Sequence, residues 1–452
     1  MKTTFKKILP IIIPSLSLQI IEFGNMGIDS IMVGRYDPLA LGGTSLASTL
    51  FLFVFVFFLG VILMTGPLVA QASGAKNNVM VVRTVRSACW LAIFSIIAIV
   101  YIMSYTESLA IALGFDQKTT QYVLEYMTFK KLTAVGLLIL PYRFFLTNQK
   151  VFKPIIILSL ISLPINALLN WVLIYGNLGF DEMGVYGAGL ATFISMCISV
   201  VLIISTATYY ANTWGMNLWI KFWKIDFEII KRIFSFGFFV GLMIMTELSL
   251  FGIANIFVAG MDIYSIAAFG VMFQVWSLIF GIQLGIAEGA NLYTAYEAGA
   301  KRYTPIIKGS IITAIILFIV SGVICCILYF TPETLYHIFL NPNNPDTISM
   351  MPILFSINLL LLILIFLESI IQLPSQLLKS INDTKYLPVI QGIGYLLVAP
   401  SIMYITTHIY DYGIVGVMFG MFCGMIVTSL LVTSRLLYAL KPENIFKYVE
   451  TK

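Results

Sequence analysis

Apolar runs long enough to cross a lipid bilayer recur from end to end of this 452-residue chain. A membrane-spanning helix needs about 20 consecutive, predominantly apolar residues. Only 10% of the residues are charged, against about 25% in ordinary globular domains. We therefore predict an all-α polytopic membrane protein with twelve transmembrane helices. Their approximate bounds are 10–34, 44–70, 87–105, 120–146, 154–176, 185–209, 230–259, 265–292, 306–330, 349–377, 388–408 and 413–437.

The use of cysteine and histidine argues against disulfide, zinc and enzymatic chemistry. All five cysteines lie in apolar stretches without metal-ligand spacing, which favours buried free thiols. The two histidines, His337 and His408, stand far apart, and the connections between helices are short. A membrane-embedded transferase would need a polar catalytic constellation on one membrane face. We predict that the protein is not an enzyme, needs no cofactor, and keeps its first apolar segment rather than losing it as a signal peptide.

The charges of the connections predict how the chain lies in the membrane. Basic residues gather in alternate connections, for example Lys76 and Arg83 in one and Lys301 and Arg302 in another. The remaining connections hold mainly acidic residues. By the positive-inside rule both termini are cytoplasmic, and an even number of spans agrees. The predicted location is the inner (plasma) membrane, with many passes.

The two halves of the sequence resemble each other. A shift of 225 positions places GIDSIMVGRYD (27–37) on GIANIFVAGMD (252–262), Glu22 on Glu247, and GAK (74–76) on GAK (299–301). Six spans per half is an even number, so both halves insert in the same orientation, as in parallel-repeat transporters. We predict two pseudo-symmetric six-helix bundles around a central cavity. The predicted divisions are an N-terminal lobe (1–210), a cytoplasmic linker (211–228), a C-terminal lobe (229–440) and a cytoplasmic tail (441–452).

Four polar side chains interrupt the first apolar run: Gln19, Glu22, Asn25 and Asp29. Successive residues of a helix are about 100° apart, so these four form one polar stripe. A charge at membrane depth costs about 2.5–3.5 kcal/mol even on the lenient insertion scale, so the stripe faces a bundle interior or a watery cavity. The two amides fit hydrogen bonding between helices. The two acids fit a site that binds a cation or a proton.

Other acids recur at membrane depth in the second half of the chain. Glu247 and Glu368 have no basic residue within one helical turn, and Gln372 follows Glu368 by one turn. An isolated buried carboxylate binds a proton or holds a cation, which is what an ion-coupled carrier requires. Glu288, at a helix end, is expected to be a solvated residue instead.

Two short polar side chains lie in the fifth and sixth runs. Asn170 stands in LLNWVLIYG and Thr192 in GAGLATFIS. If the first bundle closes around Asp29, their oxygens would complete a cation or proton site there. The alternative for Thr192 is a hydrogen bond to its own helix backbone.

Several stretches together resemble the multidrug and toxic compound extrusion (MATE) family, in its bacterial NorM-like branch. The resemblance runs over the whole chain and rests on the order and spacing of its motifs. They are IDSIMVG, GPLVAQASGAK, RFFLTNQKVFKP (143–154), LNWVLIYG, GVYGAGLAT and Glu247 in the seventh run.

The resemblance implies a fold and a set of residue roles. It implies two six-helix lobes that export cationic, amphipathic compounds, driven by inward movement of Na⁺ or H⁺. Asp29 matches the acid of the N-lobe site, with Asn170 and Thr192 as its partners. Glu247 matches the glutamate of the C-lobe cation site, and Glu368 stands where NorM-like members usually have aspartate. These three acids are the candidate ligands of Na⁺.

The expected mechanism is antiport by alternating access, in which the cation and the drug stabilise different conformations. The expected partners are small cationic compounds, the coupling cation and the lipid bilayer, and the protein is expected to be a monomer that binds no nucleic acid. Aromatic rings could receive a cationic compound. Residues predicted to line the cavity or to take a secondary part in coupling are Gln19, Glu22, Asn25, Tyr36, Phe273, Gln274, Trp276, Gln283 and Gln372.

Two other transport functions fit the same sequence. A flippase for lipid-linked oligosaccharides or peptidoglycan precursors would need basic residues in the cavity to bind pyrophosphate, and Lys130 with Lys131 keeps this alternative open. The alternative for these two lysines is that they extend from the outer end of the fourth helix toward water. An exporter of one specific metabolite is compatible with the sequence as well.

Overall fold

The computed structural model describes residues 2–25, 32–33, 36, 38–112, 114, 116–340, 345–447 and 449, which are helical almost throughout. In chain order the elements of the first half are α1 (Lys2–Asn25), α3 (Pro38–Leu63), α4 (Thr65–Gly74), α5 (Asn78–Met103), α6 (Thr106–Ala112), α7 (Gln117–Lys130), η1 (Lys131–Leu138), α8 (Ile139–Asn148), α9 (Lys153–Tyr175), η2 (Asn177–Gly179) and α10 (Gly184–Thr213). Those of the second half are α11 (Phe227–Ala259), α12 (Ile263–Gly299), α13 (Tyr303–Phe330), α14 (Pro332–Phe339), α15 (Pro345–Ser380), α16 (Leu387–Gln391), η3 (Gly392–Val398), α17 (Ala399–Tyr404), η4 (Ile405–Ile409) and α18 (Gly413–Ala439).

Among the described residues, ten helical segments are long and apolar enough to cross a membrane. They correspond to ten of the twelve predicted runs. The other two runs, 10–34 and 120–146, fall on α1 and on the consecutive elements α7, η1 and α8. The prediction of an all-helical, polytopic membrane fold is confirmed.

Side-chain caps explain where several helices begin. The Asn77 side chain accepts the main-chain N–H of Met80 at the start of α5. Asp116 does the same for two N–H groups of α7, and Asp262 for two of α12. Such caps satisfy N–H groups that have no partner inside the helix. The first turns of these helices are therefore fixed by residues that stand just outside the apolar runs.

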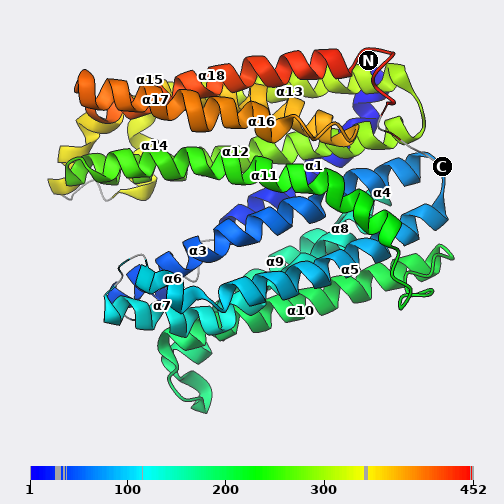
Figure 1. The fold of residues 1–452 in the computed structure, drawn as a ribbon, viewed down its shortest axis with the longest axis horizontal. Coiled ribbons are helices and arrows are strands. Elements are labelled where there is room, and N and C mark those ends of the chain that lie inside the picture. The colour runs from blue at the N-terminus through cyan, green and yellow to red at the C-terminus, as the bar shows by residue number, and fades with distance from the viewer. Residues whose placement is uncertain are drawn as a thin grey trace. The chain divides into compact units, whose positions relative to one another are not determined.

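The chain divides by packing into two compact units (Figure 1). One unit, called here the C-terminal unit, comprises Met1–Ile20 and Leu242–Lys452. The N-terminal unit comprises Ile21–Gly241. The first part of α1 thus groups with the second half of the chain, and the first part of α11 with the first half. The lobe boundaries at 210 and 229 concern the internal repeat and remain a prediction.

In the N-terminal unit, α10 packs against α7 and α9, and α4 packs against α5 and α8. The first part of α11 packs closely against α3 where Gly60 and Gly241 meet. A Cβ added to Gly60 would lie 2.5 Å from the Cα of Gly241, which leaves no room for any side chain there. Small residues allow membrane helices to approach closely, and packing rather than hydrophobic burial then holds them together.

In the C-terminal unit, α15 packs against α12, α13 and α18, and α17 runs along α18 (Figure 1). The start of α1 contacts α12 closely, since a Cβ added to Gly285 would lie 2.6 Å from the Cα of Leu16. The stretches η3 and η4 are π-helical, a local widening that is frequent at functional sites. The centre of this unit is where polar side chains from α11, α12, α15 and α16 come together.

Candidate functional site

The polar centre of the C-terminal unit is built around the amide of Gln372 on α15. Its Nε2 donates one hydrogen bond to Oε1 of Glu247 on α11, at 2.9 Å. The same nitrogen donates a second to Oε1 of Glu368, at 2.8 Å. Two carboxylates from different helices are therefore held by one neutral donor. Their role in coupling transport to a cation remains a prediction.

Helical geometry and burial explain why these groups meet. Glu368 and Gln372 are four residues apart on α15, so they project from the same face. Glu368 is 2% exposed and Gln372 is 4% exposed, while Glu247 is half-buried. A buried carboxylate needs a charged or hydrogen-bonding partner to offset its lost hydration. One amide shared by two carboxylates leaves most of their acceptor capacity for another partner.

A buried lysine accompanies the two acids. Lys379, two turns after Gln372 on α15, is 5% exposed and interacts electrostatically with Glu288 and Glu247. Gln19 on α1 donates its Nε2 to Oε2 of Glu288 at 2.7 Å. The expectation that Glu288 is a solvated helix-end residue was wrong, because it is half-buried, accepts a hydrogen bond from α1 and interacts electrostatically with Lys379 on α15. The reason is that α1 packs directly on this part of α12.

Two residues of this centre were missed in the sequence. Gln391 on α16 hydrogen-bonds Glu247, and it is 2% exposed. Tyr395, one turn later, is 1% exposed, hydrogen-bonds Thr428 and lies close to Glu368. The available signal was an amide and a phenol spaced four residues apart in the apolar stretch LPVIQGIGYLL. That spacing places both on one helix face, as it does for Glu368 and Gln372.

A second set of buried amides lies along α12. Gln283 donates its Nε2 to Oγ of Ser321 at 2.9 Å and to the carbonyl oxygen of Ile365 at 2.8 Å. Asn291 donates its Nδ2 to Oε1 of Gln376 at 3.0 Å. Gln283, predicted to line the cavity or to take a secondary part in coupling, joins α12, α13 and α15 inside the unit. Its hydrogen bonds are those of polar contacts between packed membrane helices.

Three residues predicted to line the cavity lie on α12, and they differ in how much of their side chain is exposed. Phe273 and Trp276 on α12 stack with their ring centroids 6.0 Å apart. The ring centroid of Phe251 on α11 lies 4.2 Å from that of Trp276. Trp276 is buried in the core of its unit. Gln274 is exposed. Of these, only Phe273 and Gln274 keep side-chain surface that a substrate could reach directly.

The N-terminal candidates are described only in part. Asp29 lies outside the described residues, as do the side chains of Glu22 and Asn25. Asn170 on α9 is fully buried, and its Nδ2 donates to Oδ1 of Asn166 at 3.2 Å. Thr192 on α10 donates its hydroxyl to the carbonyl oxygen of Ala188, in its own helix, at 3.0 Å.

Tyr36 lies beside the start of α10. Its hydroxyl donates to Oε1 of Glu182 at 2.8 Å, and its ring meets that of Tyr175 edge-on. The ring is 38% exposed. Tyr36 therefore contacts the connection between α9 and α10, and its role at a cavity remains a prediction.

The chemistry of the C-terminal centre follows from its donors and charges. Lys379 offsets at most one of the two acids, Glu247 and Glu368, when both are ionised. A second positive partner, either a proton or a small cation, would offset the other. Carboxylate and amide oxygens are donors that hard cations prefer. Within the described residues no group of three or more His, Cys, Asp or Glu side chains gathers as a metal site, so a cation here would rely on amide or main-chain oxygens as well.

Comparisons with known proteins agree on one family. The family model MatE matches residues 10–172 and 227–405. The chain is 25% identical, over 97% of its length and 95% of the relative, to the probable multidrug resistance protein NorM of Agrobacterium fabrum. It is 24% identical, over 92% of its length and 90% of the relative, to the probable multidrug resistance protein NorM of Bacillus thuringiensis subsp. konkukian.

Solved structures show the same fold. The eukaryotic MATE transporter AtDTX14 superposes with a TM-score of 0.84 at 18% identity, over 96% of both chains. A multidrug resistance MATE family transporter in an outward-facing conformation gives a TM-score of 0.84 at 17% identity, over 97% of this chain and 96% of that one. Because the family model covers more than half of the chain, this protein belongs to the multidrug and toxic compound extrusion (MATE) family, whose members are membrane transporters and not enzymes.

Proposed function

We propose that this protein exports small cationic, amphipathic compounds in exchange for Na⁺ or H⁺, by alternating access. Transporters of this family are coupled to a cation. The relatives that match along nearly the full chain are named as probable multidrug resistance proteins. The remaining elements of the proposal rest on the polar centre of the C-terminal unit.

The observation that carries the proposal is the pair of carboxylates, Glu247 and Glu368, held by the one amide nitrogen of Gln372. Such a site binds a cation when both acids are ionised and releases it when water or another charge reaches them. Coupling requires that the cation and the exported compound stabilise different conformations. A site that binds a positive charge in one conformation and releases it in the other gives the cation its preference between the two conformations.

The proposed setting follows from the charge pattern. Both termini are proposed to lie in the cytoplasm of a protein of the inner membrane. The protein is proposed to act as a monomer. The export direction is outward, with the coupling cation moving inward. The half-buried Phe273 and the exposed Gln274 are candidates for contact with the exported compound.

The flippase alternative depends on free positive charge at Lys130 and Lys131. The Nζ of Lys130 lies 5.3 Å from the ring centroid of Tyr126 and 5.8 Å from that of Phe51. Its charge is thus already in contact with two aromatic faces. A cation–π contact keeps the full positive charge of the ammonium, so the choice between drug export and pyrophosphate transport is made by the transport test below.

The test is transport of a fluorescent cation such as ethidium into or out of proteoliposomes that contain the purified full-length protein. Sodium and pH gradients are imposed separately. We expect one gradient to drive transport, and Glu247→Gln and Glu368→Gln each to lower the gradient-driven rate about tenfold or more, because each removes one of the two negative charges that require a cation.

Glu333→Gln is the matched control, because Glu333 is an exposed acid of α14 in the same unit. It should transport like the unmodified protein. Transport that ignores both gradients, or that persists fully in both site variants, would refute cation coupling at these acids. Transport of a lipid-linked pyrophosphate but not of ethidium would favour the flippase.

A further inference from the structure

A cavity of about 670 Å³ lies in the N-terminal unit between the start of α5 and the segment 215–227 that leads into α11. These residues lie within the predicted linker (211–228), and the name linker is used below for residues 215–227. Four basic side chains and one acidic side chain line the cavity: Arg83, Arg86, Lys221, Lys224 and Asp226. Apolar side chains, among them Val79, Val82 and Ile225, form the remaining wall. The cavity therefore combines excess positive charge with an apolar surface.

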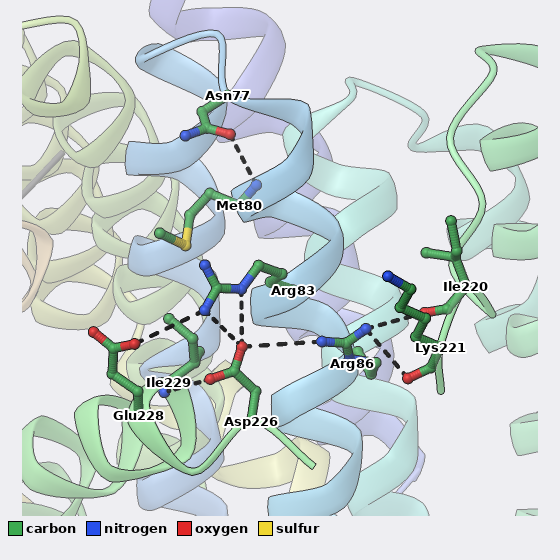
Figure 2. A network of polar contacts seen from close by, with 9 residues as sticks. All are labelled: Asn77, Met80, Arg83, Arg86, Ile220, Lys221, Asp226, Glu228 and Ile229. Carbon is green, nitrogen blue, oxygen red and sulfur yellow. Dashed lines mark hydrogen bonds and ion pairs between the residues drawn. The ribbon is translucent and has the colours of Figure 1, made fainter. Parts of the chain in front are cut away.

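Arg86 is the buried basic residue of this wall, with 7% of its surface exposed. Its Nη1 donates to the carbonyl oxygens of Ile220 at 3.0 Å and Lys221 at 3.3 Å (Figure 2). Its Nη2 lies 3.9 Å from Oδ2 of Asp226. In the described part of the chain its Nε is buried and has no hydrogen-bond acceptor. A buried guanidinium with an unused N–H is costly unless an anion comes to it.

Asp226 does not neutralise the cavity. Its Oδ2 accepts a hydrogen bond from Nε of Arg83 at 2.8 Å and forms an ion pair with Nη2 of Arg83, also at 2.8 Å (Figure 2). Lys221 and Lys224 are exposed, and neither forms an ion pair with an acid among the described residues. Once Arg83 and Asp226 are paired, Arg86, Lys221 and Lys224 leave the cavity positive.

The linker also presents aromatic side chains to its surroundings. Met216 and Leu218 are buried, and Trp90 of α5 donates its indole N–H to the carbonyl oxygen of Phe222 at 2.9 Å. By contrast Trp223 is 78% exposed and Phe227 is 69% exposed. Tryptophan is enriched where membrane headgroups meet acyl chains. The docked linker thus lies with one face on the protein and an aromatic face outward, beside the positive cavity.

We propose that this cavity binds an anionic phospholipid of the membrane face on which the linker lies. The phosphate lies among Arg86, Lys221 and Lys224, and the acyl chains extend along the apolar wall toward Trp223 and Phe227. Clusters of basic residues next to a membrane helix attract anionic lipid, and guanidinium groups match phosphate oxygens. The proposal is independent of which compound is exported and of which cation is coupled.

The test is native mass spectrometry of the full-length protein in detergent. Phosphatidylglycerol and phosphatidylcholine with identical acyl chains are added in equal amounts. We expect phosphatidylglycerol to be retained about tenfold more. Lys221→Gln combined with Lys224→Gln should remove most of that preference, and Arg86→Gln should remove it as well.

The matched control is Lys308→Gln combined with Lys385→Gln, because both lysines are exposed and lie outside the cavity. It should retain lipid like the unmodified protein. If Arg86→Gln fails to fold, the exposed lysine pair still tests the proposal. Trp223→Ala should weaken the retention of lipid without affecting any binding of sn-glycerol 3-phosphate, because the aromatic face contacts only acyl chains.

Three outcomes would overturn the proposal. Equal retention of the two lipids would show that the protein binds phospholipid without recognising the negative charge of the headgroup. An unchanged preference in the Lys221 and Lys224 double variant would place the lipid elsewhere. Full displacement of phosphatidylglycerol by millimolar sn-glycerol 3-phosphate would identify a site for soluble phosphate instead.

Discussion

Glu247 on α11 and Glu368 on α15 accept hydrogen bonds from the same nitrogen, the Nε2 of Gln372, at 2.9 and 2.8 Å. The two acids are 121 positions apart in the sequence. A single neutral donor fixes their relative position without neutralising either one. This arrangement holds two carboxyl groups side by side in the C-terminal unit and leaves each with acceptor capacity for a further positive partner.

Gln372→Leu should lower gradient-driven transport about tenfold or more. The substitution keeps a side chain of similar size but removes the donor common to both acids. A hydrogen bond to a charged group contributes about 1.5–3 kcal/mol, and 1.4 kcal/mol corresponds to a factor of ten in rate. The measurement is ethidium transport in proteoliposomes. Gln121→Leu is the control, since Gln121 donates to the side chain of Glu125 on its own helix α7, an exposed position. Equal transport by the two variants would contradict the prediction.

Lys379→Met should lower the melting temperature by roughly 5 °C or more, because it removes the positive partner of Glu247 and Glu288 inside the unit. Losing one member of a buried charge pair costs about 3–5 kcal/mol. Combining it with Glu288→Gln should restore part of the loss. The measurement is a thermal melt of the four proteins of this double-mutant cycle. Strict additivity of the two changes would show that Lys379 and Glu288 do not interact.

Gly241→Val should destabilise the packing of α11 on α3 by about 1–3 kcal/mol. A Cβ at this position would lie 2.5 Å from the carbonyl oxygen of Phe57, which is backbone and cannot rotate away. Overpacking of this kind forces helices apart. Gly252→Val on the same helix is the control, because a Cβ there meets no atom within 4 Å. The two variants are compared by thermal melting, and equal melting temperatures would count against the close approach.

The cap of α12 predicts a pH dependence. The side chain of Ser265 donates to Asp262, and this bond together with main-chain N–H groups lowers the pKa of that carboxyl below its ordinary value. A pKa that is lower in the folded protein gives stability that is present above the unfolded pKa, near 4, and lost as the pH falls through the folded value.

Asp262→Asn should therefore melt with a smaller dependence on pH below about 4 than the unmodified protein, while keeping a capping oxygen. The measurement is the melting temperature between pH 3 and pH 7. Glu333→Gln serves as the comparison because it changes an exposed acid on α14. Identical pH profiles for Asp262→Asn and the unmodified protein would contradict the role of this cap.

Parts of the site were predictable because they depend on one helix at a time. The spacing of Glu368 and Gln372 places them on one face of α15 whatever surrounds them. Their burial also followed, since apolar residues flank them on both sides. Gln391 and Tyr395 have the same spacing, yet they carry no charge, and an amide in an apolar run is too common to single out.

The surroundings of Glu288 show where sequence reasoning failed. Its position near a helix end indicated contact with water, but Gln19 reaches it from a helix 269 positions away in the sequence. The partners of Gln283 likewise lie on other helices, α13 and α15, and the sequence did not identify them. Which helix neighbours which depends on packing between distant segments, and the pattern along a single helix does not contain that information.

The sequence by itself determined the apolar spans, the internal repeat and the presence of acids at membrane depth, because these depend on local hydrophobicity and on the periodicity of one helix. Only the tertiary structure decided that Glu247 and Glu368 share one donor, that Lys379 lies between acids from two helices, and that the linker closes over a positive cavity. The physical reason is that a polar group in a low-dielectric interior is satisfied by whichever partner packing brings within about 3 Å, and that partner is most often distant in sequence.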